Sequence, residues 1–242
     1  MTGGSSGVGF AVARALAREG ARVAIAGRRR QALDSATAAI AEASGAEVIA
    51  LAADVSEAGE GERIVKAAIG RFGALDVLVN NAALFALVPL LDADAAEAAR
   101  FFATNVVGAL ECARAFARWA FGAGRTGAIV NVSSIAGRRP APGCGLYSAS
   151  KAALEMLTRS MALEWGPKGM RVNALALGHV ATEGVIEDFR AGRLDEQQIL
   201  RSIPARRIAD GDDIAEAALF LASDKARHIM GAVLTVDGGE GM

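Results

Sequence analysis

The stretch MTGGSSGVGFAVARALAREGARVAIAG, residues 1–27, runs from a glycine-rich turn through a helix-like segment into an apolar, strand-like segment. In such a turn, Gly3, Gly7 and Gly9 would let backbone N–H groups and a helix N-terminus approach a pyrophosphate. The spacing differs from the G-x-G-x-x-G fingerprint, and a flexible tail is the alternative for the turn by itself. The strand predicted at residues 22–27 favours the nucleotide-binding interpretation.

Apolar runs and helix-period runs then alternate to the end of the chain. Further strands are predicted at residues 47–52, 76–80, 128–132, 171–176 and 232–236, and helices near residues 57–72, 93–121, 147–165 and 212–222. This repeated βα pattern predicts an α/β fold with a Rossmann-like, doubly wound parallel sheet. Because 52% of the 242 residues are hydrophobic, the chain can bury one sizeable core, and we predict a single domain over residues 1–242.

Composition excludes several classes of partner. The net charge of -1 provides no field that would attract nucleic acid or an anionic membrane, so neither is predicted as a partner. Cys112 and Cys144 lack the spacing of metal ligands and no secretory segment precedes them, which makes a reducing cytoplasm the expected location. His179 and His228 lie far apart without clustered carboxylates, so we interpret both as structural or solvated and predict no metal site.

Polar residues follow the predicted strands directly. Asp54, Asn80, Asn81, Ser133, Ser134 and residues 178–182 all stand at such positions. Ligands of doubly wound sheets bind beyond the carboxyl ends of the strands. The sequence therefore predicts one small-molecule site along this edge of the sheet.

The segment SSIAGRRPAPGCGLYSASK, residues 133–151, contains a candidate catalytic group. Tyr147, the only tyrosine, and Lys151 stand four residues apart and would share one face of a helix. A lysine ammonium favours a nearby phenolate, and the Ser134 hydroxyl can hydrogen-bond a substrate oxygen. The pattern indicates acid–base chemistry on a carbonyl or alcohol. A solvated surface pair is the more common explanation of the Tyr147 and Lys151 spacing taken alone.

Arginine stands where an acidic residue would bind the adenosine ribose hydroxyls. The strand at residues 22–27 ends in Gly27 and is followed by Arg28, Arg29 and Arg30. A guanidinium suits a 2′-phosphate, so NADP(H) is favoured and NAD(H) is possible. An ordinary charged helix start is the alternative.

Two loops are expected to decide the choice of substrate. Residues 182–207 are irregular charged helical pieces broken by Gly184, Gly192 and Pro204, and we predict a mobile flap there, with a plain surface excursion as the alternative. Residues 135–146 include the basic run Arg138-Arg139. That run could meet an acidic partner or an anionic substrate, but an exposed basic loop is the favoured interpretation.

Over essentially the whole chain, these residues resemble the short-chain dehydrogenase/reductase family. Thr2-Gly3-x-x-x-Gly7-x-Gly9 is similar to the family's cofactor turn, Asn80-Asn81-Ala82 to most of its N-N-A-G motif, and the VDGG near the end to its terminal signature. The resemblance implies Ser134, Tyr147 and Lys151 as catalytic residues. It also implies that Asn105 supports a water-linked proton relay to the lysine.

The turn and the resemblance together imply a set of cofactor-binding residues. These are Gly3, Ser5, Ser6, Gly7, Val8, Gly9, Arg28, Asp54, Val55, Asn81, Tyr147, Lys151, Val180 and Thr182. The implied reaction moves a hydride between nicotinamide and a secondary alcohol or ketone. Tyr147 would be the general acid or base, Lys151 would lower its pKa and contact the nicotinamide ribose, and Ser134 would polarise the carbonyl.

The resemblance leaves the substrate and the assembly open. The layout is similar both to 3-oxoacyl carrier-protein reductases and to sugar or cyclic-alcohol dehydrogenases. A homotetramer or homodimer is implied, with the helices near residues 93–121 and 147–165 at an interface.

The chain departs from the family pattern at four places. Ala83, Leu177 and Met230 stand where glycine, proline and threonine are usual, and we expect reduced cofactor affinity from the first two. The strand that precedes the glycine turn in the family is missing, which predicts a gap of roughly 10 Å inside the sheet. We expect Met1 to take the place of the last residue of a short aliphatic strand in the native protein; otherwise weak stability or a rearranged sheet is expected.

These departures motivate a second hypothesis of another class. The chain would be a catalytically impaired cofactor-binding or scaffold protein built on the same fold. The complete set of Ser134, Tyr147, Lys151 and Asn105 argues against this alternative.

Overall fold

A computed structural model describes residues 1–242 as an α/β fold with six parallel strands. The strands are β1 (Val23–Gly27), β2 (Val48–Ala52), β3 (Val77–Asn80), β4 (Gly127–Ser134), β5 (Met170–Leu177) and β6 (Val233–Val236). The helices are α1 (Gly7–Arg18), α2 (Arg30–Ser44), α3 (Glu60–Phe72), α4 (Ala95–Phe102), α5 (Gly108–Gly122), α6 (Gly145–Trp165), α7 (Glu183–Arg190), α8 (Glu196–Ser202) and α9 (Gly211–Ala222). The predicted fold class is confirmed, and the predicted strand and helix ends differ from these by a few residues.

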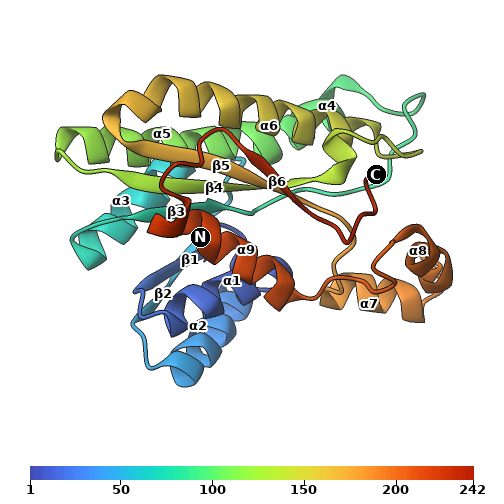
Figure 1. Ribbon diagram of the computed structural model, residues 1–242, viewed down its shortest axis with the longest axis horizontal. Helices are drawn as coiled ribbons and strands as arrows, with labels where there is room; N and C mark the ends of the chain where they lie inside the picture. Colours follow the sequence, from blue (N-terminus) through green and yellow to red (C-terminus); the bar gives the residue numbers. More distant parts are fainter.

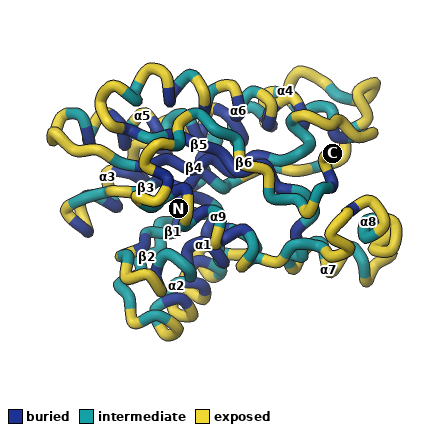
Figure 2. The backbone as a smooth tube through the Cα atoms, in the orientation of Figure 1, coloured by how far each residue is buried: buried dark blue, intermediate teal, exposed yellow.

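Helices cover both faces of the strand layer (Figure 1). The helices α3, α5 and α6 pack on one face, and α1, α2 and α9 pack on the other. Because both faces are covered, β4 and β5 are almost continuously buried, as Figure 2 shows. A buried hydrogen bond of 2.9 Å from Asn131 of β4 to Thr158 of α6 fixes the helix over the strand. A second buried bond, from the Lys151 ammonium to the Val132 oxygen at 2.8 Å, places the first turns of α6 beside the end of β4.

The strand layer is divided between β1 and β3. The strand β1 pairs only with β2, while β3, β4, β5 and β6 form a second sheet in that order. Residues 1–3 join the two parts at their carboxyl ends: the Thr2 N–H donates to the Val79 oxygen at 3.0 Å, and the Gly3 N–H donates to the Ala26 oxygen at 2.8 Å. The predicted interruption of the sheet at this position is confirmed.

An apolar groove of about 300 Å³ occupies the rest of the space between β1 and β3. Fourteen of its 17 lining residues are hydrophobic, among them Leu16, Ile64 and Phe72. The Met1 ammonium group lies at this groove and donates to the Ala24 oxygen at 2.9 Å. We call this space the interstrand groove. It leaves the facing edges of β1 and β3 without a strand partner.

The prediction of one continuous helix near residues 93–121 is wrong, because the helix is interrupted. A π-helical turn, Ala103–Val107, separates α4 from α5. Such turns insert one residue per turn and often present a side chain to a functional site. Here the turn directs the buried Asn105 toward the loop that follows β3. The alanine-rich helical pattern carries no signal for this interruption.

The helices α7 and α8 lie apart from the main layers, in the predicted flap (Figure 1). Neither contains a buried residue, and Figure 2 shows α8 as largely exposed. Ile203, just after α8, is 1% exposed and anchors the segment to the body of the protein. The mobility of the flap remains a prediction. None of the helices combines the length and the apolar character that a membrane span requires.

Candidate active site

The three predicted catalytic residues come together at the carboxyl end of β4. Ser134 is the last residue of β4, and Tyr147 and Lys151 lie on the first turns of α6. The Lys151 ammonium donates to the Val132 oxygen at 2.8 Å and lies 5.6 Å from the centre of the Tyr147 ring. The Ser134 hydroxyl donates to the Leu177 oxygen at a long 3.3 Å, so it can turn to another acceptor at little cost. The group can therefore meet one substrate oxygen.

Burial is the main influence on the charges of this group. Burial raises the pKa of Tyr147, and the hydrogen bond with the Ser134 hydroxyl opposes that rise without cancelling it. Burial also lowers the pKa of Lys151 to about 8. Burial of the phenol decides the direction of this shift, and the predicted lowering of the Tyr147 pKa by Lys151 stays a prediction. Tyr147 is therefore a protonated donor at neutral pH.

Asn105 is buried, and its side chain bonds the Leu84 backbone and the Ser150 hydroxyl. Its Nδ2 donates to the Leu84 oxygen at 3.0 Å and to the Ser150 hydroxyl at 2.9 Å, and its Oδ1 accepts from the Leu84 N–H at 2.7 Å. The Ser150 hydroxyl donates onward to the Tyr147 carbonyl oxygen at 2.7 Å. Asn105 thus ties the loop after β3 to the catalytic turn of α6, with no direct bond to Lys151. The water-linked relay stays a prediction.

A cleft of about 760 Å³ opens along the carboxyl ends of β1, β2 and β3. The predicted cofactor residues that line it are Gly3, Ser5, Ser6, Val8, Gly9, Arg28, Asp54, Val55, Asn81 and Thr182. Four others, Gly7, Val180, Tyr147 and Lys151, stand outside its wall. Of these, Gly7 lies behind Thr182, because a Cβ at Gly7 would stand 3.1 Å from the Thr182 methyl carbon.

The glycine turn forms a cradle that larger residues would fill. A Cβ at Gly9 would lie 2.1 Å from the Gly3 oxygen, and Gly3 itself has a φ of +63°. The Asn81 side chain holds the turn open by donating to the Thr2 and Gly3 oxygens at 3.2 and 3.0 Å. The helix α1 begins at Gly7 without a side-chain cap, so the N–H groups of its first turn are free for an anion. These residues fit the pyrophosphate of a dinucleotide.

Charged residues mark the far end of the cleft. Arg28 and Arg29 line it, and the Arg28 side chain is 74% exposed, with only a loose 3.9 Å ion pair to Asp54. Burial acts to raise the pKa of Asp54, but hydrogen bonds from Ser56 and the charge of Arg28 outweigh it, so the net shift is downward. The Asp54 carboxylate is thus held mainly by Ser56, at 3.0 Å from its N–H and 2.7 Å from its hydroxyl. Both guanidinium groups remain available to a phosphate.

Several site residues were missed by sequence reasoning. Phe85 packs edge-to-face on the Tyr147 ring with centroids 5.0 Å apart, and Ser150 links Asn105 to α6. Arg100 and Thr104 contribute to the cleft from the segment around the π turn. Ser150 could have been suspected from its place one residue before Lys151. The position of Phe85 depends on the path of an irregular loop, which no periodicity reveals.

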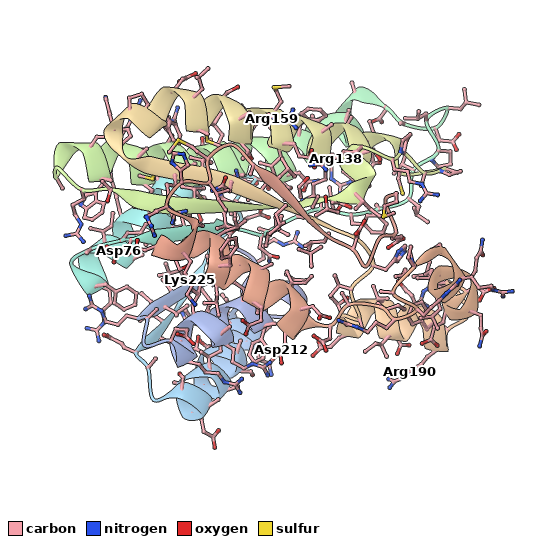
Figure 3. The ribbon with its side chains drawn as sticks, in the orientation of Figure 1. Asp76, Arg138, Arg159, Arg190, Asp212 and Lys225 are labelled. Carbon is pink, nitrogen blue, oxygen red and sulfur yellow. The ribbon has the colours of Figure 1, made fainter.

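The basic run in the loop after β4 is held by contacts within the chain. Arg138, labelled in Figure 3, donates to the buried Glu155 carboxylate at 2.9 Å. Glu155 also accepts from the Ser133 hydroxyl at 3.1 Å. Arg139 donates to the Glu240 backbone oxygen at 2.6 Å. These arginines therefore stabilise the loop beside Ser134.

Comparisons with known proteins agree with this site. A family model described as "Enoyl-(Acyl carrier protein) reductase" matches residues 3–240. The chain is 39% identical to the sorbitol dehydrogenase of Cereibacter sphaeroides, over 100% of this chain and 96% of that protein. It is 37% identical to a 3-oxoacyl-[acyl-carrier-protein] reductase of Staphylococcus aureus strain Mu50, over 99% of this chain and 96% of that protein.

A solved structure shares the whole fold. It is an Agrobacterium tumefaciens protein described as a 2-deoxy-d-gluconate 3-dehydrogenase, with NADP bound. The TM-score is 0.90 at 33% identity, covering 99% of this chain and 94% of the other. Because the family model, the relatives and the assembled serine, tyrosine and lysine all agree, the chain belongs to the short-chain dehydrogenase/reductase family and is an oxidoreductase.

Proposed function

We propose that this oxidoreductase uses NADP(H) to interconvert a secondary alcohol and its ketone, with Tyr147 as the general acid and base. The observation that carries this proposal is the meeting of Ser134, Tyr147 and Lys151 beside a cleft whose far end holds Arg28 and Arg29. The two arginines favour a 2′-phosphate, and NAD(H) is the alternative cofactor.

The residues of this chain perform the proton transfer and orient the reactants. In the reducing direction, Tyr147 donates its phenolic proton to the carbonyl oxygen, and in the oxidising direction it accepts the alcohol proton. The Ser134 hydroxyl donates to the same oxygen and polarises it. The Lys151 ammonium, fixed by the Val132 oxygen, stabilises the phenolate as the proton leaves. When bound, the nicotinamide supplies or accepts the hydride.

Replacing Tyr147 with phenylalanine tests the proposed acid. Tyr147→Phe keeps the ring and its contact with Phe85 but removes the proton. We expect kcat for ketone reduction to fall by at least about 100-fold, with the Kd for NADPH within about threefold of the natural value. Turnover near the natural rate would remove Tyr147 from this role.

The loop after β3 favours a substrate with an apolar group beside the carbonyl. Its side chains Phe85, Leu87, Leu90 and Leu91 are 60%, 63%, 67% and 101% exposed. The Val88 N–H donates to the Gly143 oxygen at 2.8 Å, which holds this apolar strap, residues 84–91, against the start of α6. Phe85 brings the strap onto Tyr147 itself. A polyol would find no hydrogen-bonding partner on these four side chains.

A turnover panel compares the candidate substrates directly. Apolar ketones such as 2-octanone, acyl thioester models of 3-oxoacyl substrates, and the polyols sorbitol and galactitol would each be assayed with NADPH or NADP⁺ and with the NAD pair. We expect kcat/KM for apolar ketones to exceed that for polyols by at least about tenfold, and Phe85→Ala to reduce this ratio. A polyol preference would overturn the apolar assignment but leave the cofactor and the role of Tyr147 intact.

If the protein were instead a 3-oxoacyl carrier-protein reductase, it would need a basic surface that binds an acidic partner. The support for this alternative is the likeness to the Staphylococcus aureus reductase. Against it, Arg138 and Arg139 are engaged by Glu155 and by the Glu240 backbone. Strong preference for a carrier-bound 3-oxoacyl group over the free thioester would favour this alternative.

A further inference from the structure

A buried carboxylate near the end of the chain has no part in the proposed mechanism. Glu240 is 7% exposed, and its two oxygens bind a single residue of the turn after β5. Oε1 lies 2.6 Å from Nδ1 of His179, and Oε2 accepts from the His179 N–H at 3.0 Å. Burial acts to raise the pKa of Glu240, but the bonds from His179 and the charge of Arg139 lower it overall. A buried charge with this many bonds is fixed in place.

The tail that carries Glu240 is itself rigidly folded. Asp237 accepts from the Gly239 N–H at 2.9 Å and from the Gly241 N–H at 2.7 Å, which closes a turn around Glu240. Gly238 has a φ of +61° and Gly239 a φ of +90°, conformations that favour glycine. The turn therefore presents the Glu240 side chain in one direction.

The same tail contacts two other loops at the active site. The Ala205 N–H donates to the Gly238 oxygen at 3.0 Å, which joins the tail to the segment after α8. Arg139 donates to the Glu240 backbone oxygen at 2.6 Å, which joins it to the loop after Ser134. We call residues 237–241 the C-terminal clasp. It holds three active-site loops at one point.

The turn held by Glu240 connects the catalytic group to the cofactor cleft. Leu177, at its start, offers its oxygen to the Ser134 hydroxyl at 3.3 Å, and Thr182, at its end, lines the cleft. The Gly178 N–H donates to the Val236 oxygen at 3.2 Å, which ties Gly178 to β6. His179 is the first residue of the turn beyond this backbone bond. Leu177 does not fix its own φ as a proline would. Glu240 supplies an alternative restraint one residue beyond Gly178.

The hydride passes to or from a carbon whose oxygen Ser134 and Tyr147 would hold, so the nicotinamide half belongs at the end of the cleft near them, where Thr182 lines the wall. We propose that Glu240 is a positioning residue, whose clasped carboxylate holds His179 and thereby places Thr182 against the nicotinamide half of the cofactor. This rests on the proposed NADP(H) function. The adenosine half would be held elsewhere, by the glycine turn and Arg28, and no residue of the clasp lines that cleft. Loss of the clasp should therefore weaken binding of the nicotinamide half alone.

Two ligands separate this role from general structural damage. NADPH carries the nicotinamide, whereas 2′,5′-ADP carries only the adenosine half with its 2′-phosphate. We expect Glu240→Ala to raise the Kd for NADPH about tenfold and to leave the Kd for 2′,5′-ADP within about twofold, both by isothermal titration calorimetry. Glu240→Gln keeps an oxygen acceptor for the His179 N–H and should restore NADPH binding to within about threefold. Met242→Ala, on a side chain that is 97% exposed, is the matched control and should change neither constant.

The remaining outcomes overturn the proposal in distinguishable ways. Failure of the natural chain to bind NADPH would overturn the proposed cofactor and this inference with it. The positioning role alone would be overturned if the natural chain binds NADPH normally and Glu240→Ala weakens binding of both ligands equally. It would also be overturned if Glu240→Ala weakens binding of neither ligand. If Glu240→Ala does not fold, His179→Ala removes the ring contact from the other side. That variant should raise the Kd for NADPH about threefold and leave 2′,5′-ADP unchanged, and an unchanged NADPH constant would overturn the inference.

Discussion

The buried Lys151 ammonium donates to the main-chain oxygen of Val132 at 2.8 Å. This relationship fixes the lysine between β4 and the Tyr147 ring. It also explains why burial lowers the pKa of Lys151 from 10.5 to about 8. The positive charge of Lys151, which assists Tyr147 in the proposed mechanism, is therefore lost as the pH rises through about 8.

The first prediction concerns the pH dependence of ketone reduction. Below about pH 8 Lys151 is an ammonium and stabilises the forming phenolate, and above it the group is a neutral amine. We expect kcat/KM for NADPH, which reports the free enzyme, to be level from about pH 6 to 8 and then to fall about tenfold per pH unit. Tyr147 stays protonated over this range because its pKa is raised. A level profile from pH 7 to 9.5 would contradict the role of Lys151.

Lys151 affects stability with the opposite dependence on pH from its effect on kcat/KM. Its pKa in the folded protein is lower than in the unfolded chain, so the unfolded chain binds more protons between about pH 8 and 10.5. This group's contribution to the free energy of unfolding therefore rises with pH in that window. Urea denaturation of Lys151→Met at both ends of the window should lack this contribution.

The second prediction concerns the choice of cofactor. Arg28→Glu places a carboxylate where the 2′-phosphate would lie and where ribose hydroxyls could be accepted. We expect the Kd for NADPH to rise at least about tenfold and the Kd for NADH to fall. Arg30→Glu is the matched control, because Arg30 pairs with Asp34 and does not line the cleft. Equal effects of the two substitutions would show that only overall charge matters.

The third prediction concerns the interstrand groove. A strand-forming extension of about five apolar residues before Met1 would pair with the free edges of β1 and β3 and fill the groove of about 300 Å³. It would also replace the buried Met1 ammonium, whose pKa burial lowers to about 6, with a neutral amide. We expect the melting temperature to rise by roughly 5–15 °C, from a net gain of about 2–5 kcal/mol after backbone ordering.

An extension of equal length made of glycine and serine is the control for that experiment. It removes the charge from Met1 but supplies no apolar side chains to the groove. A similar rise in melting temperature with both extensions would assign the gain to the lost charge. No rise with either would show that the groove does not accept a strand.

The fourth prediction concerns Asn105. Asn105→Ala leaves the Leu84 N–H and oxygen and the Ser150 hydroxyl without their partner in a buried site. We expect the free energy of unfolding to fall by about 2–4 kcal/mol, measured in urea. Hydrogen exchange at the Leu84 amide should accelerate, and protection equal to that of the natural protein would contradict the assigned contact.

The fifth prediction concerns assembly, which is expected from the family resemblance. On α6, Leu163 is 80% exposed and Met156 is 57% exposed, positions suited to an apolar contact between copies. We expect Leu163→Glu to lower the molar mass measured by light scattering from that of a dimer or tetramer. Leu91→Glu, at a leucine outside α6 that is 101% exposed, should leave the mass unchanged. A monomeric natural chain would refute the expected interface.

Most of the residues that the sequence assigned to the cofactor line one cleft, whereas the effect of burial on Tyr147 was not foreseen. Gly3, Gly9, Asn81 and Thr182 all line one cleft, because residues at the carboxyl ends of parallel strands meet at one edge. The net rise in the Tyr147 pKa could not be foreseen, because spacing along a helix reveals a neighbouring charge but not the depth of burial. The missed contact of Phe85 has a similar cause, since it depends on how an irregular loop crosses α6.

Local patterns could be recognised in the chain alone: the βα alternation, the glycine turn, and the position of Tyr147 and Lys151 on one helical face. Periodicity and turn chemistry act over a few residues, so they can be read without coordinates. The packed layers were needed to reveal the π turn around Asn105, the contact between Glu240 and His179, and the groove between β1 and β3. Each of these depends on groups far apart in the chain, whose burial and partners arise only when the layers pack.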